Sequence, residues 1–502
     1  MEAYLDRDVK LNSTAQTKDG SIKGQVVRGG VNLAVGQIFI QICSFARNII
    51  IARLISPADF GIASMFAISL SLVEMISSLA AEKLIIQASE GDSERFQSTI
   101  QCLQFFRGCV IGLVLFSIAG PLARLFGVED ARWAFRWLGF IPFIRGLIHQ
   151  DMTRLQRHMK FGPSILVEVG VSVVVTIAAF PLGKWFGDYS AMLWIIVAQA
   201  GIGVLGSHIV AERRYRWALD KGIISQVLTF GWPLLINGLL MFGILQGDRF
   251  MIGAASRLFG REIYSLGDLG VYSVAFSLAF APTVLITSIS TPLFLPLLSR
   301  VQDSERSFER RYYFVCQTIA LAGGLFSIPF IISGEWIIRV IYGSKYANAG
   351  SVIAWLAAMQ ALRIIRTGPT LAAMAKGDTK NAMYSNVVRS VAFVGVVMTA
   401  AFGGSLSLIA ASGFMGEVLA MGFCVGRLQR VHRIPMMVCL KPALLSGAFM
   451  IFGAAAGSVF HMNQSLLVSL SVSLATLICF LGGIFFAFKN FRNELITFVA
   501  NN

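Results

Sequence analysis

Charged side chains inside long apolar stretches are the residues of this 502-residue chain with the chemistry for a site. Arg145 and His149 are four residues apart, and Arg363 and Arg366 are three apart, so each pair shares one face of a helix. A charge inside a bilayer span costs about 2.5–3.5 kcal/mol on insertion scales and usually faces a cavity or a partner. Guanidinium groups bind phosphate oxygens through two parallel hydrogen bonds. The arginines therefore predict a phosphate or acidic-sugar site, unless each pairs with a carboxylate between helices.

Polar residues also recur at helical spacing along two apolar stretches near the N-terminus. Stripes of this kind line either a wet path, where they would suit sugar hydroxyls, or a seam between helices. The first stripe consists of Gln37, Gln41, Ser44 and Asn48, flanked by Arg47, and the second of Ser71, Glu74, Ser78 and Glu82.

The composition excludes an ordinary soluble protein. Hydrophobic residues make up 56% of the chain and charged residues 14%, whereas soluble domains contain about 25% charged residues. Lysine and arginine outnumber aspartate and glutamate by 42 to 27, which in so apolar a chain indicates membrane topology and predicts no nucleic-acid partner. Seven cysteines form no CxxC pair and no cluster with histidines, so we expect no metal site and no cofactor.

Apolar segments of bilayer length recur along the whole chain and predict an all-α polytopic membrane protein with about fourteen transmembrane helices. A tail of residues 1–24 precedes them and a tail of residues 488–502 follows. The predicted helices cover residues 25–51, 60–82, 97–119, 133–152, 163–181, 190–211, 223–248, 269–298, 312–333, 351–373, 382–402, 404–426, 440–461 and 465–487.

Most of the lysines and arginines lie in the tails and in the even-numbered loops. The clusters Arg213–Lys221 and Arg427–Lys441 follow the sixth and twelfth predicted helices. Because cytoplasmic loops collect these residues, we expect both termini on the cytoplasmic side of a bacterial inner membrane.

An internal repeat divides the chain. Phe60–Phe66 resembles Leu269–Ala275, and Phe143–Gly146 resembles Ile364–Thr367. The order and parity of these matches predict two six-helix lobes in parallel orientation, residues 25–211 and 223–426, with helices 13 and 14 (440–487) appended.

The repeat also relates Arg145 to Arg366, and it places Arg389 at the position equivalent to Glu168. This charge reversal leaves three alternatives open. The two side chains form an ion pair between the lobes, each pairs within its own lobe, or Glu168 couples transport to protons, a role for which Glu74 is also a candidate.

The segment Ala52–Gly61 (Ala-Arg-Leu-Ile-Ser-Pro-Ala-Asp-Phe-Gly), followed by a serine-containing helix and by Leu84–Gln87, resembles the N-terminal signature of bacterial polysaccharide-repeat flippases. These belong to the multidrug/oligosaccharidyl-lipid/polysaccharide exporter superfamily. The resemblance implies two lobes around a central cavity that works by alternating access. It implies an undecaprenyl-diphosphate-linked oligosaccharide as substrate, for O-antigen, capsule or exopolysaccharide synthesis. The segment Ala80–Lys83 departs from the glycine-rich end that this helix usually has.

The substrate-binding candidates are Arg145, Arg363, Arg366, Arg389, Arg47, Gln37, Gln41 and Asn48. Membrane lipids, and a polysaccharide polymerase with its chain-length regulator, are the expected partners. An ion-coupled multidrug exporter of the same superfamily is the nearest alternative, although it would carry buried carboxylates rather than arginines. A membrane enzyme acting on lipid-linked sugars is the second alternative, but no GxxxxGK[ST], HExxH or GxSxG motif is present and no large outer loop is expected.

Overall fold

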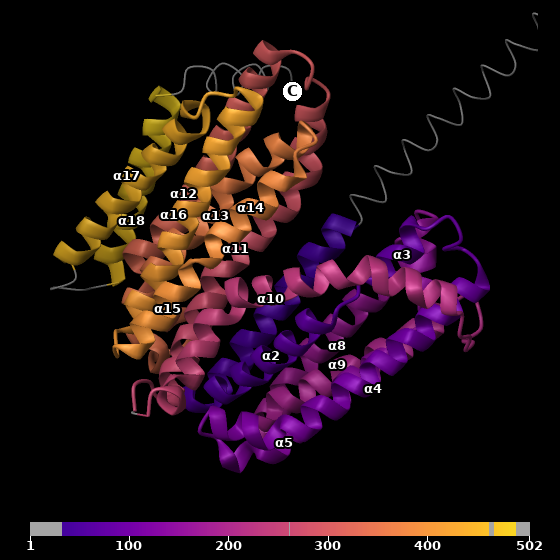
Figure 1. The fold of residues 1–502 in the computed structure, drawn as a ribbon. Helices are drawn as coiled ribbons and strands as arrows, with labels where there is room; N and C mark the ends of the chain where they lie inside the picture. Colours follow the sequence, from indigo (N-terminus) through magenta and orange to yellow (C-terminus); the bar gives the residue numbers. More distant parts are fainter. Residues whose placement is uncertain (1–32, 261, 461–465, 488–502) are drawn as a thin grey trace, which may run out of the picture.

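The computed structural model describes residues 33–260, 262–460 and 466–487, and the two predicted tails lie outside these ranges. The described residues form helices joined by loops, without strands, as Figure 1 shows. Thirteen helices in these ranges are long and apolar enough to cross a membrane. The predicted all-α polytopic membrane fold is therefore confirmed.

The first group of helices runs to residue 210. It comprises the first helix (Leu33–Leu54), α2 (Pro57–Ser77), α3 (Ala81–Gln87), α4 (Glu94–Leu125), the short helix η1 (Glu129–Ala131), α5 (Arg132–Leu138), α6 (Phe140–Gly146), α7 (Asp151–Arg157), α8 (Gly162–Phe186) and α9 (Ser190–Val210). We call this group the N-lobe.

The remaining helices form a bridging helix and a second group. They comprise α10 (Lys221–Leu258), α11 (Leu266–Ser299), α12 (Glu305–Tyr342), η2 (Ser344–Ala349), α13 (Gly350–Ala375), α14 (Thr379–Ser390), α15 (Ala392–Ala401), α16 (Leu406–His432), α17 (Met437–Phe460) and α18 (Leu466–Ala487). We call α11 to α18 the C-lobe. The bridging helix α10 packs against α2 and α4 on one side and against α14 and α15 on the other.

Two predicted helices are interrupted. The predicted span 133–152 is wrong as a single helix, because it consists of α5, α6 and α7 with breaks at Gly139 and after Gly146. The predicted helix 60–82 ends at Ser77, and Ala80 adopts a left-handed conformation (φ 48°) before α3 begins. Glu82 therefore does not continue the polar stripe that contains Glu74.

The two lobes converge at one end and diverge towards the other, as Figure 1 shows. We call these the narrow end and the splayed end. The narrow end contains the start of α2, the start of α11 and the end of α12. The splayed end contains α3, α7 and the connection between α13 and α14.

The same sequence pattern starts α2 and α11 at the narrow end. Ser56 caps α2 by accepting a hydrogen bond from the backbone nitrogen of Asp59 (3.1 Å), and Pro57 occupies the first turn. Ser265 and Asp268 form a capping box at the start of α11. A glycine follows two residues after each aspartate, and α2 and α11 cross there. The repeat found in the sequence thus extends back to both caps.

Cationic side chains from each lobe cap a helix of the other lobe at the narrow end. Arg53 donates to the carbonyl oxygens of Ile341 (2.7 Å) and Val340 at the end of α12. Lys345 donates to the carbonyl oxygens of Arg53 (3.0 Å) and Ile55 at the end of the first helix. Because the last carbonyl groups of a helix lack partners within it, these exchanged caps satisfy both helix ends and join the lobes.

Candidate functional site

A cavity of about 300 Å³ lies between the two lobes, and we call it the central cavity. Its wall combines groups from the first helix, α2, α6 and α9 with groups from α10 and α11. Its charged side chains are three arginines and one glutamate, namely Arg47, Arg145, Arg249 and Glu74. The lining therefore carries a surplus of two positive charges in an otherwise apolar bundle.

Arg145 reaches the central cavity from the last turn of α6. Its position depends on close packing of α6 against α4, where a β-carbon on Gly108 would overlap the carbonyl oxygen of Pro142. Arg145 forms an ion pair with Glu74 of α2, and each side chain is about one third exposed (35% and 37%). The guanidinium is thus paired and still open to the cavity.

Arg47 and Asn48 of the first helix also line the central cavity. Arg47 donates to Oε1 of Gln199 on α9 (3.2 Å) and to Oγ of Ser44 (3.3 Å). Gln37 and Gln41 are half-buried on the same helix but do not line the central cavity. The predicted stripe therefore faces the cavity in its second half only.

Arg249 is a cavity residue that the sequence analysis missed. It lies inside α10, only 13% exposed, with its guanidinium carbon 4.1 Å from the ring centroid of Phe276. Its neighbour Asp248 accepts a hydrogen bond from the hydroxyl of Tyr272 (2.8 Å). The length of this helix could have revealed it. Because α10 continues to Leu258, Arg249 lies well inside the helix rather than at its end.

A second cavity, of about 580 Å³, lies within the N-lobe towards the splayed end, and we call it the N-lobe cavity. Arg145 and Gln199 line both cavities and thus stand at their junction. His149 also lines the N-lobe cavity, from the break between α6 and α7 rather than from the helix of Arg145. Glu168 of α8 is exposed to it.

The C-lobe arginines converge on one buried carboxylate. Glu417 of α16 is fully buried and receives Nε of Arg363 (2.8 Å), Arg366 (3.3 Å) and Arg389 (2.6 Å). The three arginines are 8–10% exposed. The alternative of an ion pair between Arg389 and Glu168 is wrong for this conformation, because Arg389 pairs within its own lobe.

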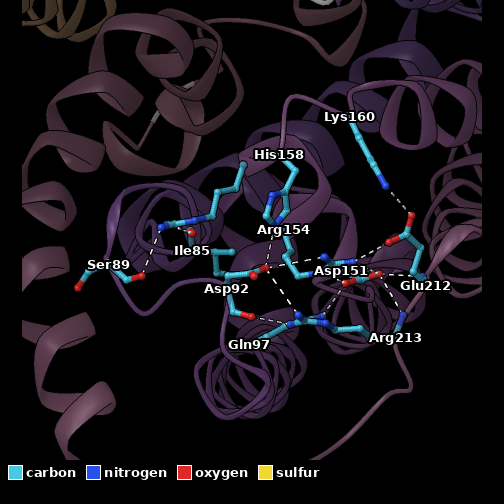
Figure 2. A network of polar contacts seen from close by, with 11 residues as sticks. Ile85, Ser89, Asp92, Gln97, Asp151, Arg154, His158, Lys160, Glu212 and Arg213 are labelled. Carbon is cyan, nitrogen blue, oxygen red and sulfur yellow. Dashed lines mark hydrogen bonds and ion pairs between the residues drawn. The ribbon is translucent and has the colours of Figure 1, made fainter. Parts of the chain in front are cut away.

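A polar network ties the splayed end of the N-lobe together, as Figure 2 shows. Asp151, at the start of α7, is fully buried and accepts from Arg154 (2.5 Å) and from the backbone nitrogens of Glu212 (2.7 Å) and Arg213 (3.2 Å). The hydrogen bond from His158 (2.8 Å) lowers the pKa of Asp92, against a smaller effect of burial. The network fixes α7, which follows the break that carries His149.

The family model described as polysaccharide biosynthesis protein matches residues 50–351, more than half of the chain. The lipopolysaccharide biosynthesis protein WzxC of Escherichia coli (strain K12) is 19% identical over 363 residues, covering 71% of this chain and 72% of the relative. The amylovoran biosynthesis protein AmsL of Erwinia amylovora is 22% identical over 269 residues, covering 51% of this chain and 65% of the relative.

Two solved structures show the same fold. The lipid II flippase MurJ in an inward closed conformation superposes with a TM-score of 0.69 at 14% identity, covering 90% of this chain and 98% of MurJ. An inward-facing multidrug resistance MATE family transporter of the MOP superfamily gives a TM-score of 0.54 at 14% identity, covering 86% and 100%. Because the family model matches more than half of the chain, this chain belongs to the polysaccharide biosynthesis protein family.

Proposed function

We propose that this protein is a flippase that moves an oligosaccharide linked to undecaprenyl diphosphate across the bacterial inner membrane. The observation that carries this proposal is the central cavity, where Arg47, Arg145 and Arg249 from both sides of the lobe interface outnumber the single Glu74. A diphosphate supplies negative charge to this lining, in which Glu74 pairs with Arg145 and Asp248 lies 3.9 Å from Arg249. Relatives named for lipopolysaccharide and amylovoran biosynthesis support the class of substrate.

In this mechanism the phosphates displace Glu74 from Arg145. Arginine suits this exchange because its planar fork matches phosphate oxygens in the same way as it matches a carboxylate. Arg363, Arg366 and Arg389 are held by Glu417 in this conformation, so we assign them a contribution through their surplus positive charge. A direct contact with substrate would require their release from Glu417.

The lobes alternate between a state open at the splayed end and a state open at the narrow end. The splayed end is the cytoplasmic one in this proposal, because Arg213–Lys221 and Arg427–Lys441 lie there and cytoplasmic loops collect such residues. The substrate then enters from the cytoplasm and leaves at the outer face, where a polymerase with its chain-length regulator would receive it.

The membrane potential provides a driving force for this direction. The free energy of a unit charge changes by about 2.3 kcal/mol per 100 mV when it crosses the membrane. Two uncompensated negative charges that leave a negative interior therefore favour export by about 4.6 kcal/mol per 100 mV. A proton antiport through Glu168 or Glu74 is the alternative coupling mechanism.

The test uses the full-length protein in liposomes with a fluorescent undecaprenyl diphosphate oligosaccharide and an impermeant quencher. We expect flipping well above empty liposomes, faster with an inside-negative potential and much slower for Arg145→Gln. Flipping that ignores the potential but follows a pH gradient would support proton coupling. Transport of an organic cation with no flipping of the lipid would refute the flippase and favour a multidrug exporter.

A further inference from the structure

The N-lobe cavity has the size of a small-molecule binding site and is continuous in its lining with the central cavity. Its volume of about 580 Å³ falls within the usual range of about 300–1,000 Å³ for ligand sites. Arg145 lines both cavities. A group attached to a phosphate on Arg145 can therefore extend either into the central cavity or into the N-lobe cavity.

Glu168 is the carboxylate of the N-lobe cavity for which the described residues provide no partner. It lies two turns into α8, a helix that is long and apolar enough to cross a membrane. It is exposed to the cavity, and within the described residues it has no hydrogen bond or ion pair. An ionisable residue within a membrane span is expected to serve a ligand or a partner. Because no partner is present in the described chain, Glu168 points to a ligand.

The rest of the lining mixes apolar and polar side chains and has no excess of positive charge. The lining holds two carboxylates, Glu82 and Glu168, and besides Arg145, which pairs with Glu74, its one lysine or arginine is Lys83, so this cavity has no positive surplus. Neutral side chains supply both donors and acceptors, including Thr153 and Gln156 of α7, Ser172 of α8 and Gln199 of α9.

Gln150 adds a second unsatisfied group. It is 3% exposed, lies on the cavity wall, and its Oε1 has no hydrogen-bond partner among the described residues. Buried polar atoms are nearly always hydrogen-bonded, and an exception calls for a missing partner. A mixture of neutral donors, neutral acceptors and one free carboxylate matches hydroxyl groups better than it matches a second anion.

We infer that the N-lobe cavity is a saccharide subsite, which holds the sugar residues next to the diphosphate. Glu168 accepts hydrogen bonds from sugar hydroxyls, and Gln156 and Gln199 complete the contacts. The inference rests on the proposed function, because the diphosphate on Arg145 delivers the sugar to this cavity. In this arrangement the central cavity binds the charged diphosphate, and the N-lobe cavity binds the carbohydrate.

The test compares two lipid probes on the full-length protein in nanodiscs, namely undecaprenyl diphosphate and undecaprenyl diphosphate N-acetylglucosamine. We expect the wild type to bind the glycosylated lipid about tenfold more tightly than the bare lipid. This is the gain expected from hydrogen bonds between the Glu168 carboxylate and sugar hydroxyls. Glu168→Ala and Gln156→Ala should remove most of this preference and leave the affinity for the bare lipid unchanged. Glu309→Ala, at an exposed carboxylate on α12, is the matched control and should retain the preference.

The possible outcomes separate the inference from the proposed function. Equal binding of the two lipids by the wild type would overturn the saccharide subsite while leaving the flippase intact. Failure to bind either lipid would refute the flippase itself. If Glu168→Ala retains the sugar preference but its flipping in liposomes no longer depends on a pH gradient, Glu168 is a proton-coupling residue and its role in sugar binding is overturned. A melting measurement on each variant checks that it is folded.

Discussion

Gly61 of α2 and Gly270 of α11 each occupy the place where a side chain would strike the backbone of the other helix. A β-carbon on Gly61 would overlap the carbonyl oxygen of Leu266, and one on Gly270 would overlap that of Pro57. The two glycines are equivalent in the internal repeat, so the contact is nearly symmetrical between the lobes. Close approach of two backbones without an intervening side chain closes the narrow end.

Gly61→Val and Gly270→Val should therefore hold the narrow end open. In a background without native cysteines, Cys introduced at Ser64 in the central cavity should react faster with an impermeant maleimide added from the outer side. Export should fall while the protein remains in the membrane. Gly170→Val is the matched control, since a β-carbon there meets nothing within 4 Å. Unchanged labelling of both narrow-end variants would show that this contact does not seal the cavity.

Glu74→Gln should strengthen substrate binding. The carboxylate competes with phosphate for Arg145, and the neutral amide competes less, so we expect the affinity for undecaprenyl diphosphate to rise severalfold. Arg145→Gln should lower it, with Arg145→Lys intermediate because lysine lacks the planar fork. Calorimetric titration of the purified variants measures both effects. Weaker binding by Glu74→Gln would instead mean that Glu74 orients Arg145 for the ligand.

Glu417→Ala should destabilise the C-lobe. It would leave Arg363, Arg366 and Arg389 buried without their counter-charge, and breaking a buried ion pair from one side costs about 3–5 kcal/mol. The melting temperature in detergent should fall by several degrees. Adding Arg363→Met to Glu417→Ala should recover part of the loss. Similar melting of Glu417→Ala and the wild type would show that water or lipid already screens the cluster.

Acid should weaken the network at the splayed end. The pKa of Asp92 is lowered in the folded protein, so its contribution is present above the ordinary value of 3.8 and is lost as the pH falls through the lower folded value. Between pH 7 and pH 3 the melting temperature of the wild type should therefore drop more than that of Asp92→Asn. Equal drops would exclude Asp92 as a source of acid sensitivity.

Orientation in the membrane is directly testable. Reporter fusions after Asp188 and Asn348, near the narrow end, should read as periplasmic. Fusions after Asp220 and Ser304, near the splayed end, should read as cytoplasmic. The opposite pattern at either pair would reverse the direction of transport proposed here.

The sequence predicted the helices because a bilayer span needs a long apolar run, and such a run is visible one residue at a time. It also predicted Arg145 as a cavity residue, because a lone cation in a span has few alternatives. The breaks around Gly139 and Ala80 were missed, since they depend on packing between helices that hydropathy does not report.

The partners of the charges were harder to predict than their positions. Glu417 was one lone carboxylate in the sequence, and only the fold brings three arginines from α13 and α14 onto it. Arg249 was missed because the helix predicted over residues 223–248 continues to Leu258, so this arginine lies inside α10. Pairings between different helices depend on how the helices are rotated relative to one another, which one sequence leaves undetermined.

The exchanged caps of Arg53 and Lys345 bear on how cheaply the protein can change state. Each of their four hydrogen bonds contributes on the order of 1 kcal/mol net, and most lie where water can replace the lost donor once the lobes part. The loss of these four hydrogen bonds therefore costs only a few kcal/mol. A ligand that prefers the parted form a thousandfold supplies about 4 kcal/mol. The exchanged caps thus strengthen the closed narrow end by an amount that the binding energy of one ligand can offset.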